Sequence, residues 1–470
     1  MLDRPPKGCS RAWVVVFGAL LALPLVAQPE PAPAPAPPET PATELPAGPA
    51  HVRQEAREAL GEGVALCGRN ELLACRNKLR LAHHLWPTNF QGLFFLAQVE
   101  AQLDNPEKAE EYLTLLGKAG YVVPLEAEGL ATLRTSPAYI DAATRFGKIL
   151  DTQLGESSVA FRLPHHDMVP EGIAIDPTTG DAYVGGVHRR HIVRRAADGT
   201  VSDFATEGLM AVFGLAIDAE RRLLWVTTGG IREMKDFRAQ DAGQTALLAY
   251  DLGSGDRVAE HRIAKVGKGH RLNDLVITPE GGVYATDNTL GGGVWYLAPP
   301  QPASQPKDDR AADPAPPAPT LRQVSAPGMF RSPQGLAQSS DGTLFVADYS
   351  YGIARFDPET GHAEYLEEPQ GVCLVGIDGL TAHGDSLIAI QNGVRPHRIL
   401  RLTLDRGHSR VQGVQVLEMG NPLWNEPTLG TVIDGRFLYV ANSHWNRFDN
   451  EGNLAPIGQL TRPVILSIDL

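Results

Sequence analysis

One short pattern recurs six times between Gly172 and Val440, and it limits the folds open to this chain more than any other feature. Each copy is an apolar segment, a turn and a second apolar segment; the first reads Gly172–Asp176 followed by Ala182–Val184. Successive copies begin about 42 to about 61 residues apart, near the length of a four-stranded blade with its loops. Because one sheet cannot bury both of its faces, we expect radial stacking. The sequence therefore predicts an all-β six-bladed β-propeller over residues 158–470.

The end of the chain indicates how this ring closes. After the sixth copy only one clear strand remains, Val464–Asp469, so the last blade lacks an outer strand. The segment Val159–Leu163, just before the first copy, can supply that strand and remove an open sheet edge. Two intervals between copies hold insertions, Ile231–Gln244 and Pro299–Pro319, and the second is rich in Pro, Ala and Asp. We expect the second insertion to be an exposed loop.

The first 50 residues are typical of an export signal followed by a spacer. Basic residues precede an almost unbroken apolar run, Ala12–Val26, and Ala27 suits the last residue before cleavage. We therefore expect residues 1–27 to be a signal peptide and the protein to be exported, either periplasmic or secreted. An uncleaved N-terminal anchor is the alternative. Residues 28–50 alternate Pro and Ala, which favours an extended linker.

Residues 51–150 have the spacing of amphipathic helices. Asn105-Pro106 and Ser136-Pro137 are typical helix starts, with the proline at the first helical position, and an apolar stripe follows each. A helix pair joined by a short Asp-Asn-Pro turn resembles a tetratricopeptide-type unit. We therefore predict a small all-α, helical-hairpin domain. It is either a helical cap or an adaptor with a groove for a protein partner.

Charge and motif content exclude several classes of function. The formal net charge of −13 disfavours a nucleic-acid partner, and apart from the export signal we expect no membrane segment. The sequence has no Gly-x-Ser-x-Gly elbow, His-Glu-x-x-His helix, Gly-rich phosphate loop or Cys-x-x-Cys pair, which disfavours serine-hydrolase, zincin, nucleotide-binding and thioredoxin-like functions. Cys67 and Cys75 flank a predicted helix stop, and for them both a disulfide and free thiols stay open.

One position in the repeat is polar in four of its six copies. The residues directly before the first strand of each copy are Glu171, Phe213, Asn273, Gln334, Asp378 and Leu429. Because the innermost strands of a propeller surround its central channel, we expect the two carboxylates and two amides to point toward one place. Such oxygen donors suit a hard divalent cation, above all Ca²⁺, with Zn²⁺, Mg²⁺ and Mn²⁺ as alternatives. A structural zinc site is disfavoured because the set offers no thiolate.

These motifs resemble those of the senescence marker protein (regucalcin)/gluconolactonase/luciferin-regenerating enzyme family of six-bladed propellers, over residues 171–470. Pro170–Gly172, His270–Asp274 and Ile377–Gly379 match three motifs that this family places around a divalent metal. Ser332–Gly335 matches the fourth, except that Gln stands where the family has Asn.

The resemblance implies a role for each of these side chains. It assigns a divalent cation to Glu171, Asn273, Gln334 and Asp378, a general-base role to Asp378 as well, and substrate contacts to Arg271 and Asp274. The implied reaction is metal-dependent hydrolysis of a lactone or related ester, a small-molecule substrate, in the central channel. A non-catalytic propeller that binds a ligand or a protein, with the helices as an adaptor, is the alternative.

Two other groups of residues are weaker candidates. His165–Asp167 lies just before Glu171 and could line the channel mouth, although adjacent side chains on an extended chain point to opposite faces. Trp424, His444 and Trp445, near the last copy, either form an aromatic rim for a ligand or pack between blades.

Overall fold

The structure is a computed structural model that describes residues 49–299 and 319–470. The signal peptide predicted for residues 1–27, nearly all of the predicted linker and most of the Pro299–Pro319 insertion lie outside the described residues. Within the two described ranges, no helix combines the length and the apolar character that crossing a membrane requires.

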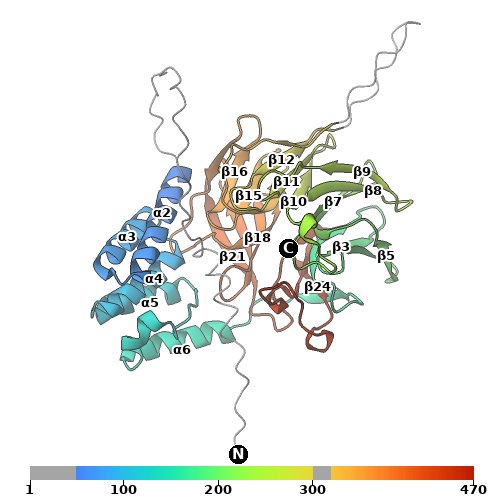
Figure 1. Cartoon of the computed structure of the whole chain (residues 1–470). Coiled ribbons are helices and arrows are strands. Elements are labelled where there is room, and N and C mark those ends of the chain that lie inside the picture. The colour runs from blue at the N-terminus through green and yellow to red at the C-terminus, as the bar shows by residue number, and fades with distance from the viewer. Residues whose placement is uncertain (1–48, 300–318) are drawn as a thin grey trace, which may run out of the picture. The chain divides into compact units, whose positions relative to one another are not determined.

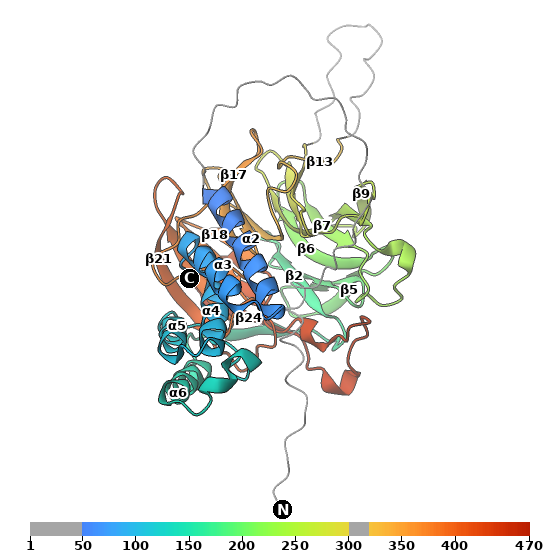
Figure 2. The same ribbon diagram turned by 60° about the vertical axis from the view of Figure 1, so that its left-hand side comes forward.

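The described chain divides into two compact units. The helical unit runs to Leu115 and includes Pro124–Ile140, whereas the propeller unit holds Leu116–Val123 and Asp141–Leu470. Figure 2 shows the helices, which are α2 (Pro49–Gly68), α3 (Leu72–Leu85), α4 (Phe90–Gln102), α5 (Pro106–Lys118), the 3-10 helix η1 (Glu128–Leu133) and α6 (Pro137–Asp151). These helices confirm the predicted small all-α region before the propeller, and α5 and α6 are divided between the two units.

Local sequence explains where these helices begin. The side-chain oxygen of Asn89 accepts hydrogen bonds from Gln91 N (3.0 Å) and Gly92 N (3.2 Å) and so caps α4. The two prolines predicted at first helical positions, Pro106 and Pro137, open α5 and α6.

A covalent link and a buried acid fix the helical unit internally. A disulfide joins Cys67 at the end of α2 to Cys75 in α3, so the bridged alternative is the one present. Glu100 in α4 is fully buried and accepts hydrogen bonds from Arg80 Nη2 (2.7 Å) and Asn105 Nδ2 (3.0 Å). Its charge is therefore paired, as a buried carboxylate requires.

The propeller unit contains six four-stranded antiparallel sheets, which confirms the predicted six-bladed β-propeller (Figure 1). Blade one is β2 (Pro170–Ile175), β3 (Ala182–Gly186), β4 (His191–Arg195) and β5 (Val201–Ala205); blade two is β6 (Ala211–Asp218), β7 (Leu223–Gly229), β8 (Thr245–Asp251) and β9 (Arg257–Arg262). Blade three is β10 (Leu272–Ile277), β11 (Val283–Asp287), β12 (Val294–Leu297) and β13 (Arg322–Gln323). Blade four is β14 (Pro333–Gln338), β15 (Leu344–Asp348), β16 (Gly352–Asp357) and β17 (His362–Tyr365).

The last two blades complete the ring. Blade five is β18 (Ile377–His383), β19 (Ser386–Gln391), β20 (Arg398–Leu404) and β21 (Val411–Met419); blade six is β22 (Gly430–Ile433), β23 (Arg436–Val440), β24 (Val464–Asp469) and β1 (Ser158–Arg162). The first strand of each blade contacts the first strand of the next, and β22 contacts β2. These six strands are the innermost ones, and they surround the axis of the propeller.

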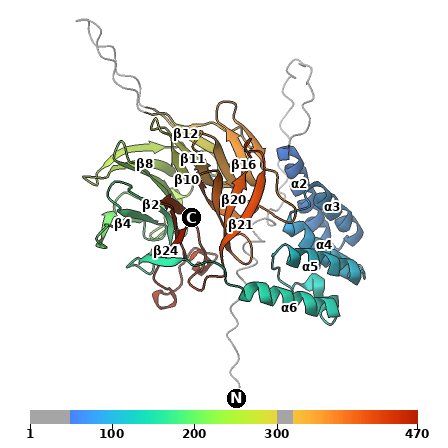
Figure 3. The same ribbon diagram turned by 180° about the vertical axis from the view of Figure 1, so that it is seen from behind.

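Blade six joins the two ends of the propeller sequence. Its outer strand β1 pairs antiparallel with β24, and Ser158 lies opposite Ser467. β23 and β24 of the same sheet come from the far end of the chain, and Figure 3 shows β24 from behind. The closure predicted from the missing outer strand is therefore confirmed.

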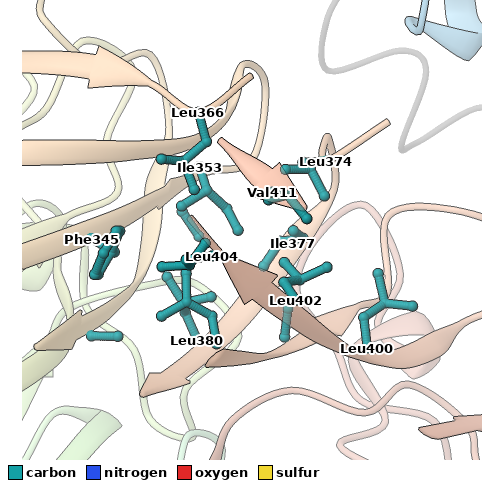
Figure 4. Close-up of a cluster of buried hydrophobic side chains, with 14 residues drawn as sticks. Phe345, Ile353, Leu366, Leu374, Ile377, Leu380, Leu400, Leu402, Leu404 and Val411 are labelled. Carbon is teal, nitrogen blue, oxygen red and sulfur yellow. The ribbon is translucent and has the colours of Figure 1, made fainter. Parts of the chain in front are cut away.

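Apolar side chains between neighbouring blades form the core. Between blades four and five, Phe345 and Ile353 pack with Leu380, Leu400 and Leu402, and none of the five is more than 4% exposed (Figure 4). Burial of each such side chain contributes about 1.5–3 kcal/mol. Because clusters of this kind lie between blades, the inner strands are held in fixed positions around the axis.

Candidate functional site

Bulges mark the start of five innermost strands, and four of these bulges each enclose one predicted metal ligand, whereas the bulge of β6 encloses Phe213. The strand register shifts between Pro170 and Ile173, Leu272 and Leu275, Pro333 and Leu336, and Ile377 and Gly379, and these intervals contain Glu171, Asn273, Gln334 and Asp378 in turn. A bulge frees a residue from the regular ladder and turns its side chain. The four residues thus occupy equivalent places in four blades.

Glycines beside these positions let neighbouring inner strands approach closely. A Cβ atom on Gly214 would lie 2.5 Å from Asn273 O, and one on Gly335 would lie 2.6 Å from Asp378 O. Only glycine fits at such distances from a backbone oxygen. The backbone of each of these two site residues therefore rests directly on the inner strand of the preceding blade.

Threonine hydroxyls hold the same backbone segments from the neighbouring blade. Thr286 Oγ1 donates to Gln334 O (2.6 Å), Thr428 Oγ1 donates to Glu171 O (2.8 Å), and Thr227 Oγ1 donates to Asn273 O. A buried carbonyl with such a donor avoids the cost of an unpaired polar group. Three of the four site residues are thus fixed through their main chain by another blade.

Amide side chains link the two middle positions of the site. Gln334 Oε1 accepts hydrogen bonds from Asn273 Nδ2 (3.0 Å) and from Asn288 Nδ2 (2.9 Å). Asn288 Oδ1 in turn accepts a hydrogen bond from Arg271 Nε. Gln334 therefore orients Asn273, whose own oxygen lies on the other side of its planar amide group.

Separate donors hold the two carboxylates. Trp445 Nε1 donates to Glu171 Oε2 at 2.6 Å, and Asn392 Nδ2 donates to Asp378 Oδ2 at 2.7 Å. The Tyr349 hydroxyl donates to Asn392 Oδ1 at 3.2 Å and so fixes that amide. One oxygen of each carboxylate thus accepts a hydrogen bond from the protein, and this bond fixes the orientation of the group.

Burial raises the pKa values of these carboxyl groups. Glu171 is 4% exposed, and burial lifts its pKa well above the ordinary value, with further increases from the negative charges of Asp378 and Glu426. Burial raises the pKa of Asp378 to about 6, against the hydrogen bond from Asn392 and the charge of Arg271. Burial and the charge of Asp378 raise the pKa of Glu426 to about 7. The three acids are therefore close enough to disfavour one another's ionisation.

Arg271 places a positive charge beside these acids. Burial lowers the pKa of its guanidinium, and the negative charges of Glu233, Asp287, Glu171 and Asp378 oppose that effect. Its backbone N–H donates to Asp287 Oδ1 at 3.0 Å, while Asp287 Oδ2 lies 2.7 Å from His270 Nδ1. Arg271 is therefore anchored through both its main chain and its Nε atom.

Asp274 lies on the same inner strand but makes backbone contacts. Its Oδ1 atom accepts a hydrogen bond from Leu275 N (2.9 Å), and its Oδ2 atom accepts one from Leu336 N (2.9 Å). Burial raises its pKa to about 7. These contacts join blade three to blade four, and the substrate contact expected for Asp274 stays a prediction.

The structure adds four side chains to the predicted set, and it places Trp445, one of the weaker sequence candidates, against Glu171. Asn288, Tyr349 and Asn392 each directly follow the second strand of a blade, whereas Glu426 and Trp445 lie in segments on either side of β22 and β23. The first three occupy the same position in their copies of the repeat. The comparison of equivalent positions that selected the residues before the first strands would also have found them. No comparable spacing marks Glu426 and Trp445.

The remaining sequence candidates have separate places. Trp424 Nε1 donates to Tyr439 OH (2.9 Å), a contact within blade six, and His444 Nε2 lies 3.0 Å from Thr461 O. His166 Nδ1 lies 2.8 Å from Leu460 O, and the neighbouring His165 faces Asp203 in blade one. The adjacent histidines thus point in different directions, as expected for an extended segment.

The donor chemistry of the site fits a divalent cation. Glu171, Asp378 and Glu426 bring three interacting carboxyl groups together, and burial raises the pKa of each, with the charge of Asp378 raising those of Glu171 and Glu426 further. Carboxylate and amide oxygens are the ligands that Ca²⁺ and Mg²⁺ prefer. Glu171, Asp378 and Asn273 are the residues that can hold such an ion, whereas the Gln334 oxygen already accepts two N–H donors.

Comparisons with known proteins give structural neighbours but no family or curated relative. Neither a protein-family model nor a curated protein matches this sequence. Among solved structures, a Thermus thermophilus protein described as a putative oxidoreductase (glucose dehydrogenase) is 18% identical, with a TM-score of 0.45, over 67% of this chain and 99% of its own. A Xanthomonas campestris gluconolactonase is 17% identical, with a TM-score of 0.42, over 68% of this chain and 92% of its own.

A calcium-binding regucalcin from Agrobacterium tumefaciens is a further structural neighbour. It is 15% identical, with a TM-score of 0.44, over 66% of this chain and 93% of its own. A gluconolactonase and a regucalcin, two kinds of protein named in the motif resemblance, are therefore among the structural neighbours. At identities of 15–18% and TM-scores of 0.42–0.45 these likenesses assign no activity to this chain.

Proposed function

We propose that this protein is an exported, metal-dependent hydrolase of lactones or related esters, with its active site at the central channel of the propeller. The observation that carries this proposal is the cluster of Glu171, Asp378 and Glu426 beside Arg271 at the inner strand ends. Buried acids with raised pKa values next to an anchored cation are typical of catalytic sites.

The proposed cation site uses oxygen ligands from three blades. Glu171, Asn273 and Asp378 would hold a divalent ion, most simply Ca²⁺, and Gln334 orients Asn273 for this role. A bound divalent ion supplies Lewis-acid polarisation of an ester or lactone carbonyl.

The chain's own groups carry the proton transfer and the substrate orientation. Asp378 accepts the proton of the attacking water at Oδ1, because its Oδ2 atom is held by Asn392. Arg271 orients a substrate oxygen through its planar guanidinium, which Asn288 fixes at Nε. Trp445 orients Glu171 directly, and Tyr349 orients Asp378 through Asn392.

The first prediction concerns Asp378 and is tested with a panel of aldonolactones and aryl esters. Asp378→Asn should lower kcat at least about 100-fold, because it removes the base and keeps the volume of the side chain. Asp385→Asn, at an exposed turn of the same blade, is the matched control and should keep full activity. Metal content of both proteins is measured alongside the rates.

Two outcomes would contradict the hydrolase. Full lactone hydrolysis by protein freed of metal with a chelator would exclude the metal-dependent mechanism. Equal turnover by wild type and Asp378→Asn would exclude Asp378 as the base.

A non-catalytic binding propeller is the second candidate, and one observation favours it. Gln334 Oε1 accepts hydrogen bonds from Asn273 and Asn288, so one of the four positions expected to hold metal offers its oxygen elsewhere. In this case the channel binds a small ligand, and the helical unit binds a protein partner. Absence of turnover on the whole panel by metal-loaded wild type would favour this candidate.

Export is proposed on independent grounds. The apolar run Ala12–Val26 follows basic residues, and the Cys67–Cys75 disulfide is typical of proteins in an oxidising compartment. Alkaline phosphatase fused after residue 50 should be active in the periplasm of a bacterial host. An inactive fusion retained in the cytoplasm would contradict export.

A further inference from the structure

Three candidate metal ligands gather in blade one, on elements that do not belong to the proposed active site. His165 lies between β1 and β2, His191 begins β4, and Asp203 is the central residue of β5. One ligand atom from each lies within 4.8 Å of the other two. Among the residues that the structure describes, this is the one group of three or more His, Cys, Asp or Glu with such an arrangement.

Strand geometry brings His191 and Asp203 to one face of the sheet. Asp203 lies opposite Val193, and His191 precedes Val193 by two residues, so the two side chains share a face. On its other edge, β4 pairs with β3, and His191 lies opposite Gly186. A Cβ atom at Gly186 would be 2.9 Å from His191 Nδ1. The glycine thus leaves room for the imidazole ring.

His191 is buried and, within the described parts of the chain, lacks hydrogen-bond partners, as expected of a side chain that ligates a metal ion. Its side chain is buried, with 4% of the residue exposed, yet neither Nδ1 nor Nε2 has a hydrogen-bond partner among the described residues. Buried polar side chains are nearly always paired, and each unpaired group is unfavourable. Burial also favours the neutral imidazole, which is the form that binds metal ions.

His165 and Asp203 complete the cluster from its exposed side. His165 Nε2 lies 4.0 Å from Asp203 Oδ1, with 30% and 54% of these side chains exposed, and the rings of His165 and His191 meet edge to face at 5.5 Å. Ligand atoms of a tetrahedral zinc site are about 3.3 Å apart. The two exposed side chains can close that difference by changing rotamer, since the buried His191 is the fixed partner.

We infer that His165, His191 and Asp203 form a binding site for a divalent transition-metal ion of the zinc class. Two imidazoles and one carboxylate match the ligand preference of zinc and its neighbours, and differ from the all-oxygen set proposed at the channel. The nearby charge of Arg189 is compensated, because its Nη1 atom lies 3.0 Å from Asp167 Oδ1. The bound ion ties the segment before β2 to the edge strand β5.

The test is zinc binding by the untagged mature chain, measured by calorimetry in saturating Ca²⁺. Calcium occupies oxygen sites and competes poorly for imidazole, so it removes the channel from the measurement. We expect one zinc ion per chain and a higher midpoint of thermal unfolding with zinc than without it. His165→Ala and Asp203→Asn should weaken zinc binding at least about tenfold, and both replace partly exposed side chains.

Two control variants distinguish this site from neighbouring ligands. His166→Ala removes the adjacent histidine, whose Nδ1 atom contacts Leu460 O, and should leave zinc affinity unchanged. Asp378→Asn alters the channel and should also leave it unchanged. Equal zinc affinity in wild type, His165→Ala and Asp203→Asn, or no zinc bound by wild type, would overturn the inference. A loss of zinc affinity in His166→Ala as large as that in His165→Ala would also overturn it.

Discussion

At the scale of single residues, Gln334 organises one half of the proposed site. Its amide oxygen joins Asn273 from the neighbouring blade to Asn288, which in turn holds Arg271. One side chain thus positions both an oxygen donor and the cation expected to bind substrate. The longer reach of Gln, compared with Asn, allows it to serve as this link.

Loss of the Gln334 amide should therefore destabilise the protein. Gln334→Met removes the acceptor for Asn273 Nδ2 and Asn288 Nδ2, and we expect the free energy of unfolding to fall by about 1–3 kcal/mol. Gln338→Met, at the other end of β14, is the control and should change it by less than about 0.5 kcal/mol. Urea unfolding measures both, and equal stability of the two variants would contradict the linking role.

A second residue-scale prediction concerns the pH dependence of stability. Burial lowers the pKa of His397, between β19 and β20, from 6.5 to about 4. Between these values the unfolded chain binds more protons than the folded chain, so the contribution of His397 to stability falls as pH decreases from 6.5 toward 4. This loss is at most about 3–4 kcal/mol.

Replacement of His397 by a residue that does not titrate isolates this effect. His397→Gln should show a shallower loss of unfolding free energy than wild type across the same pH range, because other buried histidines contribute equally to both proteins. Urea unfolding at several pH values gives the two slopes. Identical slopes would show that His397 titrates normally in the folded state.

At the scale of secondary-structure elements, the bulged inner strands determine the site. Their glycines allow backbone contact between blades, and threonines of the preceding blade bind the carbonyls of Asn273 and Gln334. The position of each functional side chain thus depends on the neighbouring strand as well as on its own.

A methyl group at this contact should therefore be costly. Gly214→Ala would place a Cβ atom 2.5 Å from Asn273 O, and we expect the free energy of unfolding to fall by about 1–3 kcal/mol. Gly413→Ala in β21 is the control, since its Cβ atom would meet nothing closer than 3.7 Å. Thermal unfolding distinguishes them, and equal midpoints would show that the inner strands separate easily.

The sequence predicted these elements because equivalent residues recur at the same position in each copy of the repeat. That recurrence predicted the blades, the closing strand and the equivalent positions of Glu171, Asn273, Gln334 and Asp378. It did not predict the link from Gln334 to Asn288, because this contact joins residues 46 positions apart and depends on side-chain rotamers. Trp445, which holds Glu171, begins a short 3-10 helix, Trp445–Arg447, that lies outside the repeated strands.

At the scale of the whole molecule, closure of the ring depends on β1. This strand pairs with β24, so blade six contains residues from both ends of the propeller sequence. Loss of β1 would expose the edge of β24 and release the start of the propeller from its end.

Replacement of β1 by a Gly-Ser segment of equal length tests this dependence. We expect the free energy of unfolding to fall by about 3 kcal/mol or more, with aggregation through the exposed β24 edge. The same replacement of β5, which is similarly exposed but does not close the ring, should cost clearly less. Equal losses would show that β1 acts only as one more outer strand.

The contacts of Gly214 with Asn273 and of Gly335 with Asp378 also affect how such a propeller can be altered. At Asn273 and Asp378, one blade supplies the side chain and the preceding blade supplies the backbone surface on which it rests. A chimera that exchanges a single blade would therefore disturb its contacts with both neighbouring blades at once. New specificity is better sought by exchanging adjacent blades as pairs, or by altering the loops that rim the channel.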